Sequence, residues 1–113
     1  MALTHPLPEK VVELIAYRFR VIGEPTRIRL LEHLHEGETS VQELVERIGG
    51  TQQNISKHLA VLLQAGIVGR RKAGVFVYYR IVDATVFDLC EHVCGTMERQ
   101  LGELGELFQA AAR

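Results

Sequence analysis

Residues 40–82 have the sequence SVQELVERIGGTQQNISKHLAVLLQAGIVGRRKAGVFVYYRIV, and this stretch decides the fold. Apolar residues recur at helical spacing before and after Gly49-Gly50, which predicts two helices joined by a tight turn. Ser40, with a glutamate three residues later, has the spacing of a capping box, and Thr51 is a suitable N-cap for the second helix. Residues 40–65 therefore have the proportions of a helix-turn-helix.

Residues 67–82 continue with two runs of β-favouring side chains. The short turn signal Ala73-Gly74 separates the runs, and this order predicts a β-hairpin. A hairpin that directly follows the second helix of a helix-turn-helix is a wing. The predicted fold class is therefore mainly α with a β-hairpin wing, a winged helix-turn-helix.

Helical periodicity also appears on both sides of this stretch. One helix is expected over residues 8–22, a second one opens at Pro25, and a long last helix covers residues 84–111. The apolar face of the second helix is predicted to consist of Ile28, Leu31 and Leu34. The predicted order is four helices, a hairpin and a final helix, and the length of the chain predicts a single domain over residues 1–113.

Charge is distributed unevenly along the chain. The 13 basic and 14 acidic side chains give a formal net charge of −1. From Arg47 to Val82 there is no Asp or Glu, and six Lys and Arg residues give this window a charge of +6, which leaves −7 for the flanks. Clustered Lys and Arg indicate nucleic-acid binding, and the alternative is a solvated basic face.

The basic window coincides with the second helix of the helix-turn-helix and with the wing, which are the elements that contact DNA in this fold. Amide side chains at the start of that helix can pair with adenine, and Lys suits guanine or phosphate. We therefore predict a duplex DNA partner, an operator with an inverted repeat. The predicted contacts are Thr51, Gln52, Gln53, Asn54, Ser56, Lys57, His58, Arg70, Arg71, Lys72 and Arg80.

Several of these residues also have a structural interpretation. The amide side chains after Thr51 suit a capped helix start, and the basic residues 70–72 could protect a strand edge from pairing with other chains. His58 lies beside the apolar stripe of its helix and could pack there. Tyr78 and Tyr79 alternate within a strand, so packing is expected of them rather than base stacking.

A dimer is expected because one recognition helix reads few bases, and paired half-sites call for a two-fold partner. Along the last helix, cysteine and apolar residues recur at alternating spacings of four and three, which is the pattern of a helix–helix seam. The first and last helices are expected to form the dimer interface. The predicted interface residues are Val11, Leu14, Ile15, Cys90, Cys94, Met97, Leu101, Leu104 and Phe108.

Cys90 and Cys94 have two interpretations. As free thiols they behave as small buried hydrophobic residues on the predicted seam. As thiols one helical turn apart they could instead bind a soft metal or metalloid, or react with thiol reagents, together with His92 or a group from the second subunit. Two thiolates fall short of the four ligands of a closed zinc site. The expected cofactor is therefore either none or a metal or metalloid effector.

No apolar run reaches the ~18–20 residues that span a bilayer, and the N-terminus lacks a signal-peptide pattern. A cytoplasmic location, with reduced cysteines, is therefore expected. An alternative function is a winged-helix module for protein interaction and dimerisation without direct DNA readout, although the acid-free window argues against it. An enzyme is not expected, since paired carboxylates, a phosphate loop and a nucleophile elbow are all missing from the sequence.

The chain resembles the ArsR/SmtB family of bacterial repressors. The resemblance rests on GEPTRIRLL at 23–31, GE at 37–38 after Glu36, SVQEL at 40–44, QNISKHL at 53–59, AGIV at 65–68 and VYYRI at 77–81. It implies a homodimeric winged-helix repressor that an inducer, often a metal ion, releases from an operator. It also implies DNA contacts at Gln53, Ser56, Lys57 and the wing.

The metal sites that the family uses fall mostly on poor ligands in this chain. The corresponding positions are Ser40 and Gln42 in the third helix, Val61 and Ala65 in the fourth, and Asp83, Thr85, Thr96 and Arg99 in the last. Of the last-helix set, only Asp83 can bind a metal. Some members of the family sense through cysteines in the last helix, so the resemblance leaves Cys90 and Cys94 as the sensor candidates.

Overall fold

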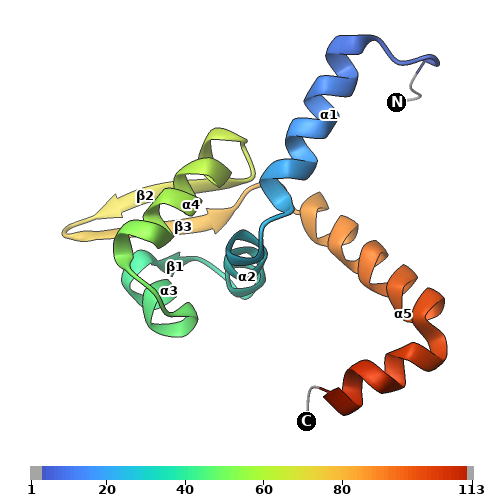
Figure 1. Ribbon diagram of the computed structural model, residues 1–113. Helices are drawn as coiled ribbons and strands as arrows, with labels where there is room; N and C mark the ends of the chain where they lie inside the picture. The colour runs from blue at the N-terminus through green and yellow to red at the C-terminus, as the bar shows by residue number, and fades with distance from the viewer. Residues whose placement is uncertain (1–3, 112–113) are drawn as a thin grey trace. The chain divides into compact units, whose positions relative to one another are not determined.

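The computed structural model describes residues 4–111, apart from the side chains at positions 103–105, 107, 108 and 111. Its elements are α1 (Glu9–Ile22), α2 (Pro25–Leu34), β1 (Thr39–Ser40), α3 (Val41–Ile48), α4 (Gln52–Gln64), β2 (Val68–Ala73), β3 (Phe76–Ile81) and α5 (Thr85–Ala111) (Figure 1). Within the described residues α3 and α4 form the helix-turn-helix, and β2 and β3 form the wing, which confirms the predicted fold class.

The chain divides into two compact units, Met1–Asp83 and Ala84–Arg113. The first contains the helix-turn-helix and the wing, and the second contains α5. The single-domain organisation over residues 1–113 stays a prediction.

The turn between α3 and α4 follows from its two glycines. Gly49 has φ 90° and Gly50 has φ 85°, a region that residues with a Cβ rarely adopt. The next residue, Thr51, is the N-cap of α4, and its side-chain oxygen accepts a hydrogen bond from the backbone N–H of Asn54 at 3.1 Å. The chain therefore turns from α3 into α4 within three residues, and the recognition helix starts at a defined residue.

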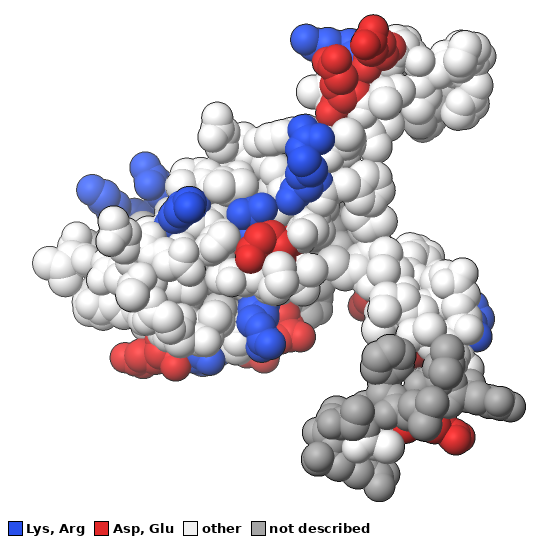
Figure 2. Space-filling view, in the orientation of Figure 1, with Lys and Arg blue, Asp and Glu red and all other residues white. Residues whose placement is uncertain are grey.

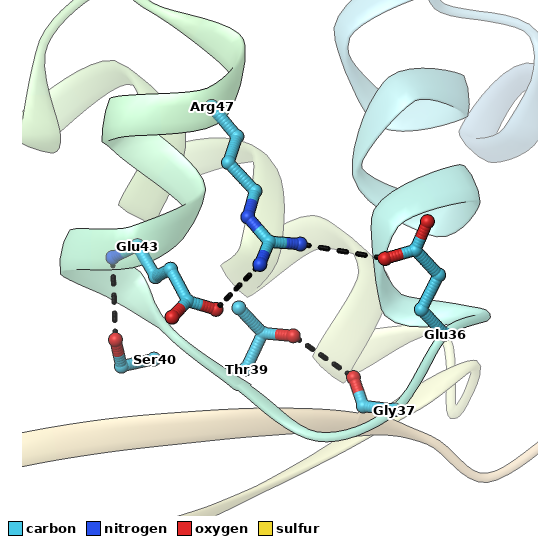
Figure 3. A network of polar contacts seen from close by, with 6 residues as sticks. All are labelled: Glu36, Gly37, Thr39, Ser40, Glu43 and Arg47. Carbon is cyan, nitrogen blue, oxygen red and sulfur yellow. Dashed lines mark hydrogen bonds and ion pairs between the residues drawn. The ribbon is translucent and has the colours of Figure 1, made fainter.

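The predicted capping box at the start of α3 is half formed. The Ser40 hydroxyl accepts a hydrogen bond from the backbone N–H of Glu43 at 3.2 Å. The Glu43 carboxylate lies instead 3.4 Å from Arg47, one turn along the helix, and Arg47 also reaches Glu36 at 3.4 Å (Figure 3). An ion pair at i,i+4 has replaced the reciprocal half of the box, because both charged side chains lie on the same exposed face of α3.

The sheet has three antiparallel strands in the order β1-β3-β2, so β3 is central (Figure 1). Thr39 and Ser40 of β1 lie opposite Tyr79 and Tyr78 of β3. Strand β1 was not predicted, since two residues are too few to show an alternating pattern. It matters because it joins the wing to the chain that enters α3.

The core of the first unit lies between the helices and the sheet. Its fully buried side chains are Leu30, Leu31, Leu44, Ile55, Leu59, Leu62, Ile67 and Val68. The prediction for α2 was wrong at one position, because Ile28 is 44% exposed and Leu30 is 0% exposed. At 100° per residue, Leu30, Leu31 and Leu34 share one stripe of α2, and Ile28 lies beyond its edge.

The helix α1 exposes most of its large apolar side chains. Leu14 is 58% exposed, and Val12, Ile15 and Phe19 are exposed as well. The C-terminal half of α1 contacts the rest of the first unit through Arg18. This side chain donates a hydrogen bond to the carbonyl oxygen of Ala65 at 2.8 Å and forms an ion pair with Asp83. Its apolar face is therefore left uncovered by the residues of its own unit.

In the second unit, α5 is not one regular helix. Gly102, with φ 29° and ψ −108°, interrupts it between two helical segments, which corrects the prediction of a continuous helix over residues 84–111. Cys90 is half-buried, Cys94 and Met97 are exposed, and Leu101 is half-buried. The side chains of Leu104 and Phe108 lie outside the described residues. Among the described residues, none of the helices is both long and apolar enough to cross a membrane.

Candidate nucleic-acid interface

The start of α4 presents polar side chains on its outer side. Ile55, Leu59 and Leu62 are buried at 1%, 0% and 0% exposure, so helical periodicity turns the intervening residues outward. The outward-facing residues are Gln52, Gln53, Asn54 and Lys57, which are exposed, and Ser56, which is half-buried. Gln53, Ser56 and Lys57 therefore share the outer face of α4, and Gln52 and Asn54 lie at its two edges.

A shallow pocket of about 230 Å³ lies between this face of α4, the start of α3 and the wing. Gln52 and Ser56 of α4, Gln42 of α3 and Arg70 of β2 supply its polar lining. Residues of the wing, among them Tyr79, supply an apolar wall. Among the described residues that line it, Arg70 is the only charged one. Such a surface can accept an anion on one side and apolar groups on the other.

The basic residues of the wing lie on two different faces of the sheet. Side chains directly opposite one another in paired strands share a face, and successive residues alternate. Arg70 lies opposite Tyr79, which lines the pocket beside α4, and Lys72 follows on the same face. Arg71 lies opposite Tyr78 and so points to the other face. The predicted cluster 70–72 is therefore divided.

Arg71 is engaged by two side chains. Its Nη2 lies 2.7 Å and its Nε 3.0 Å from carboxylate oxygens of Glu38, and its guanidinium lies 4.7 Å from the centroid of the Tyr78 ring. The hydrogen bond from Arg71 holds the pKa of Glu38 below its usual value, and the same bond raises the pKa of Arg71. The side-chain exposures are 52% for Arg71 and 29% for Glu38, so solvent screens the pair in part.

Arg80 lies on the same face of the sheet as Arg71. It is paired with Gly69, and a Cβ added to Gly69 would lie 3.2 Å from the guanidinium carbon of Arg80. The missing side chain of Gly69 therefore leaves room for the arginine to lie across the strand. The positive charge of Arg80 also lowers the pKa of Glu38.

His58 lies within the protein rather than on the outer face of α4. Arg27 of α2 donates a hydrogen bond from Nη1 to Nδ1 of His58 at 3.0 Å, and a Glu24 oxygen lies 3.6 Å from the same nitrogen. A guanidinium can only donate, so Nδ1 of His58 is the acceptor in this hydrogen bond. The side chain of His58 is only 13% exposed.

The surface charge of the first unit follows this arrangement. Figure 2 shows basic side chains along the wing and α4, and acidic side chains on the side of α3. Arg47 belongs to the acid-free window, but its pairs with Glu36 and Glu43 offset its charge. Among the described residues, Lys57, Arg70 and Lys72 form no ion pair.

The candidate sensor residues of α5 have few partners. The Cys94 sulfur lies 4.0 Å from a carboxylate oxygen of Glu98, and both Cys94 and His92 are exposed. Burial raises the pKa of the Cys90 thiol. Among the described residues, no group of three or more His, Cys, Asp or Glu side chains could hold a metal ion.

Sequence reasoning missed Glu38, Arg27 and Gln42 as residues of this interface or its support. Glu38 and Arg71 are separated by 33 positions, and Arg27 and His58 by 31, so no local pattern links either pair. Gln42 was weighed only as a replaced metal ligand, and its place in the pocket depends on how α3 packs against the wing.

Comparison with known proteins agrees with this geometry. A family model described as a helix-turn-helix domain matches residues 22–71. The HTH-type transcriptional regulator KmtR of Mycobacterium tuberculosis is 37% identical over 84 residues, which cover 74% of this chain and 65% of KmtR. The chain therefore spans just under two thirds of the length of KmtR.

Two crystal structures resemble the fold closely. That of the Mycobacterium tuberculosis protein Rv0081 has a TM-score of 0.76 at 33% identity, and the match covers 85% of this chain and 97% of Rv0081. That of the transcriptional repressor BigR from Xylella fastidiosa has a TM-score of 0.67 at 34% identity, with 75% and 87% covered.

The chain belongs to the ArsR/SmtB family of winged helix-turn-helix transcriptional regulators. This membership confirms the predicted class, a winged helix-turn-helix regulator of the ArsR/SmtB type.

Proposed function

We propose that this protein is a sequence-specific repressor that binds operator DNA in the cytoplasm as a homodimer and is released by an effector. One observation carries the proposal: the outer face of α4 and the α4-side face of the wing form a continuous surface on which Lys57, Arg70 and Lys72 have no carboxylate partner among the described residues. An unneutralised basic surface attracts the phosphate backbone.

Docking follows from the order of these groups. The start of α4 enters the major groove, where Gln52, Gln53 and Asn54 can pair with adenine edges and Lys57 can reach guanine or phosphate. The wing then follows the neighbouring backbone, with Arg70 and Lys72 on the phosphates. The DNA strand that runs between α4 and the wing would pass over the pocket. There Arg70 and Ser56 would bind a phosphate group, and the apolar wall would pack against a deoxyribose.

The uncovered face of α1 supports dimerisation. Val12, Ile15 and Phe19 are exposed apolar side chains that share one face of α1 at helical spacing, and burying them against a second copy would remove this apolar surface from water. A two-fold dimer places two copies of α4 on one side of the DNA, so the operator would be an inverted repeat with half-sites about one helical turn apart.

The proposal is tested by selection of bound duplexes from a random pool at about 0.1–0.15 M salt. The expected result is enrichment of an inverted repeat with half-sites separated by about 10 base pairs. Failure to enrich any sequence, together with binding to duplex DNA that does not weaken as salt rises, would reject it. That result would favour the alternative, a winged-helix module for protein interaction.

The proposed effector site consists of Cys90 and Cys94, which lie one turn apart on α5. We propose that they take up a soft metal ion, a metalloid or a thiol oxidant, with His92 or a group from the second subunit supplying any further ligand. A release signal must bind the DNA-incompetent state more tightly, and a coupling of ~1–3 kcal/mol is typical.

Operator binding measured with added Zn²⁺, Ni²⁺, arsenite or a thiol oxidant tests this proposal. The Cys90→Ser/Cys94→Ser double variant should bind the operator like the wild type and lose the response. An equal response in the double variant, or no response in the wild type to any of the four, would remove the cysteines as sensors.

A further inference from the structure

The face of the wing opposite α4 carries a compact set of interactions with no evident part in DNA binding. Arg71 makes a two-point ion pair with Glu38, at 2.7 and 3.0 Å, and lies over the Tyr78 ring. Arg70, its neighbour in β2, points to the α4 side and has no ion pair among the described residues. The two adjacent arginines of β2 therefore lie on opposite faces of the sheet, and of the two only Arg71 forms an ion pair among the described residues.

We propose that Arg71 is a positioning residue, held by Glu38, that fixes the wing against the helix-turn-helix and does not itself contact DNA. The inference rests on the proposed function, because the position of the wing matters through the DNA that it meets. It assigns a new role to Glu38 and changes the role predicted for Arg71.

The location of the pair explains why it would act as a brace. Glu38 directly precedes β1, and the last residue of β1, Ser40, caps α3. Arg71 lies in β2, on the far side of the central strand β3. The ion pair therefore links the outer strand of the wing, across β3, to the chain that enters the helix-turn-helix. Backbone pairing alone provides only the two-residue strand β1 for this purpose.

Contact between Arg71 and DNA is disfavoured by the same geometry. A phosphate that bound Arg71 would have to displace a carboxylate already placed for two parallel hydrogen bonds. The guanidinium would also leave the Tyr78 ring, where a cation is attracted to the aromatic face. Arg70 and Lys72 require no such exchange.

The test compares Glu38→Gln, Arg71→Gln and the charge swap Glu38→Arg/Arg71→Glu, with Arg70→Gln as the matched control. Fluorescence anisotropy with one selected duplex gives affinity as a function of salt. Glu38→Gln and Arg71→Gln should each lower the affinity for DNA about two- to fivefold, which is the scale of an exposed ion pair. Neither should change the salt slope. The swap should recover most of the loss. Arg70→Gln should lower the slope by about 0.9.

Three results would overturn the proposal: tighter binding by Glu38→Gln, a salt slope lowered by Arg71→Gln as much as by Arg70→Gln, or a swap weaker than both single variants. If Arg71 contacts DNA, Glu38→Gln would free it and tighten binding. Arg71→Gln would then remove a phosphate contact and lower the salt slope. The swap keeps the net charge of the protein constant, so long-range electrostatics cannot explain its outcome.

A second readout does not depend on DNA. Hydrogen exchange of the amides that pair β1 with β3 should be faster in Glu38→Gln and Arg71→Gln than in the wild type, and unchanged in Arg70→Gln. Equal exchange in all four proteins would overturn the brace. If the wild type fails to bind duplex DNA, the proposed function fails, whereas the exchange experiment still tests the brace by itself.

Discussion

Arg27 donates a hydrogen bond from Nη1 to Nδ1 of His58 at 3.0 Å, which links the first turn of α2 to the middle of the recognition helix. The same guanidinium donates from Nε to the carbonyl oxygen of Val21 at 2.5 Å and from Nη2 to that of Arg20 at 3.3 Å, near the end of α1. One side chain therefore holds three helices. The orientation of α4 depends on it, although neither Arg27 nor His58 lies on the outer face of α4.

Replacement of His58 by Leu leaves a charged donor without its acceptor in a partly buried position. The free energy of unfolding should fall by about 1–3 kcal/mol, as measured by urea denaturation. Arg27→Gln should lower it as well, and Arg29→Gln, an exposed change on the same helix, should have little effect. Wild-type stability in His58→Leu would contradict the role given to this hydrogen bond.

The dimer proposed through α1 predicts a clear effect of Ile15→Glu. A carboxylate on the exposed apolar face of α1 should weaken self-association by about tenfold or more, since a buried unpaired charge is costly. Analytical ultracentrifugation measures the dissociation constant, and Lys10→Glu, on the opposite side of the same helix, serves as the control. A dimer of unchanged affinity in Ile15→Glu would place the interface elsewhere.

The two cysteines should differ in reactivity. Burial raises the pKa of the Cys90 thiol. At pH 8 a smaller share of Cys90 than of an ordinary cysteine is therefore thiolate, the form that reacts with alkylating reagents. Cys94 is exposed. Iodoacetamide should therefore modify Cys94 first, with the order read by peptide mass spectrometry, and the two rates should converge in denaturant. Faster modification of Cys90 in the folded protein would contradict this environment.

The pair between Glu38 and Arg71 should make the wing sensitive to acid. Because the pKa of Glu38 is lowered in the folded state by the hydrogen bond from Arg71, its contribution is present above the ordinary value of 4.5 and is lost as pH falls through the folded-state pKa. An NMR titration of the Glu38 carboxyl should show the lowered pKa and its return toward 4.5 in Arg71→Gln. Equal values in both proteins would contradict the pair.

The sequence predicted those parts of the fold that depend on local patterns. The capping residues Ser40 and Thr51 and the glycines between α3 and α4 defined the helix-turn-helix, because each acts within a few residues of its position. The charge window indicated the proposed DNA surface for the same reason. Strand β1 was missed, since its two residues are a strand only because β3 lies beside them.

The roles of individual charged residues could not be read in this way. Arg47, Arg71 and His58 all lie in the basic window, yet each is occupied by a partner that is distant in sequence or on its own helix. Arg70 and Arg71 are adjacent and identical in type, and only the register of β2 against β3 shows that they face opposite ways. That register is a property of the folded sheet.

The most direct test of the DNA surface is the salt dependence of binding to one selected duplex for the Lys57→Gln/Arg70→Gln double variant. Lys10→Gln/Arg29→Gln, which removes two exposed charges outside this surface, is the control. If Lys57 and Arg70 each meet a phosphate, the slope of log affinity against log salt should fall by about 1.8 in the first variant and stay at the wild-type value in the control. An unchanged slope and affinity in the Lys57→Gln/Arg70→Gln variant would contradict the surface formed by α4 and the wing.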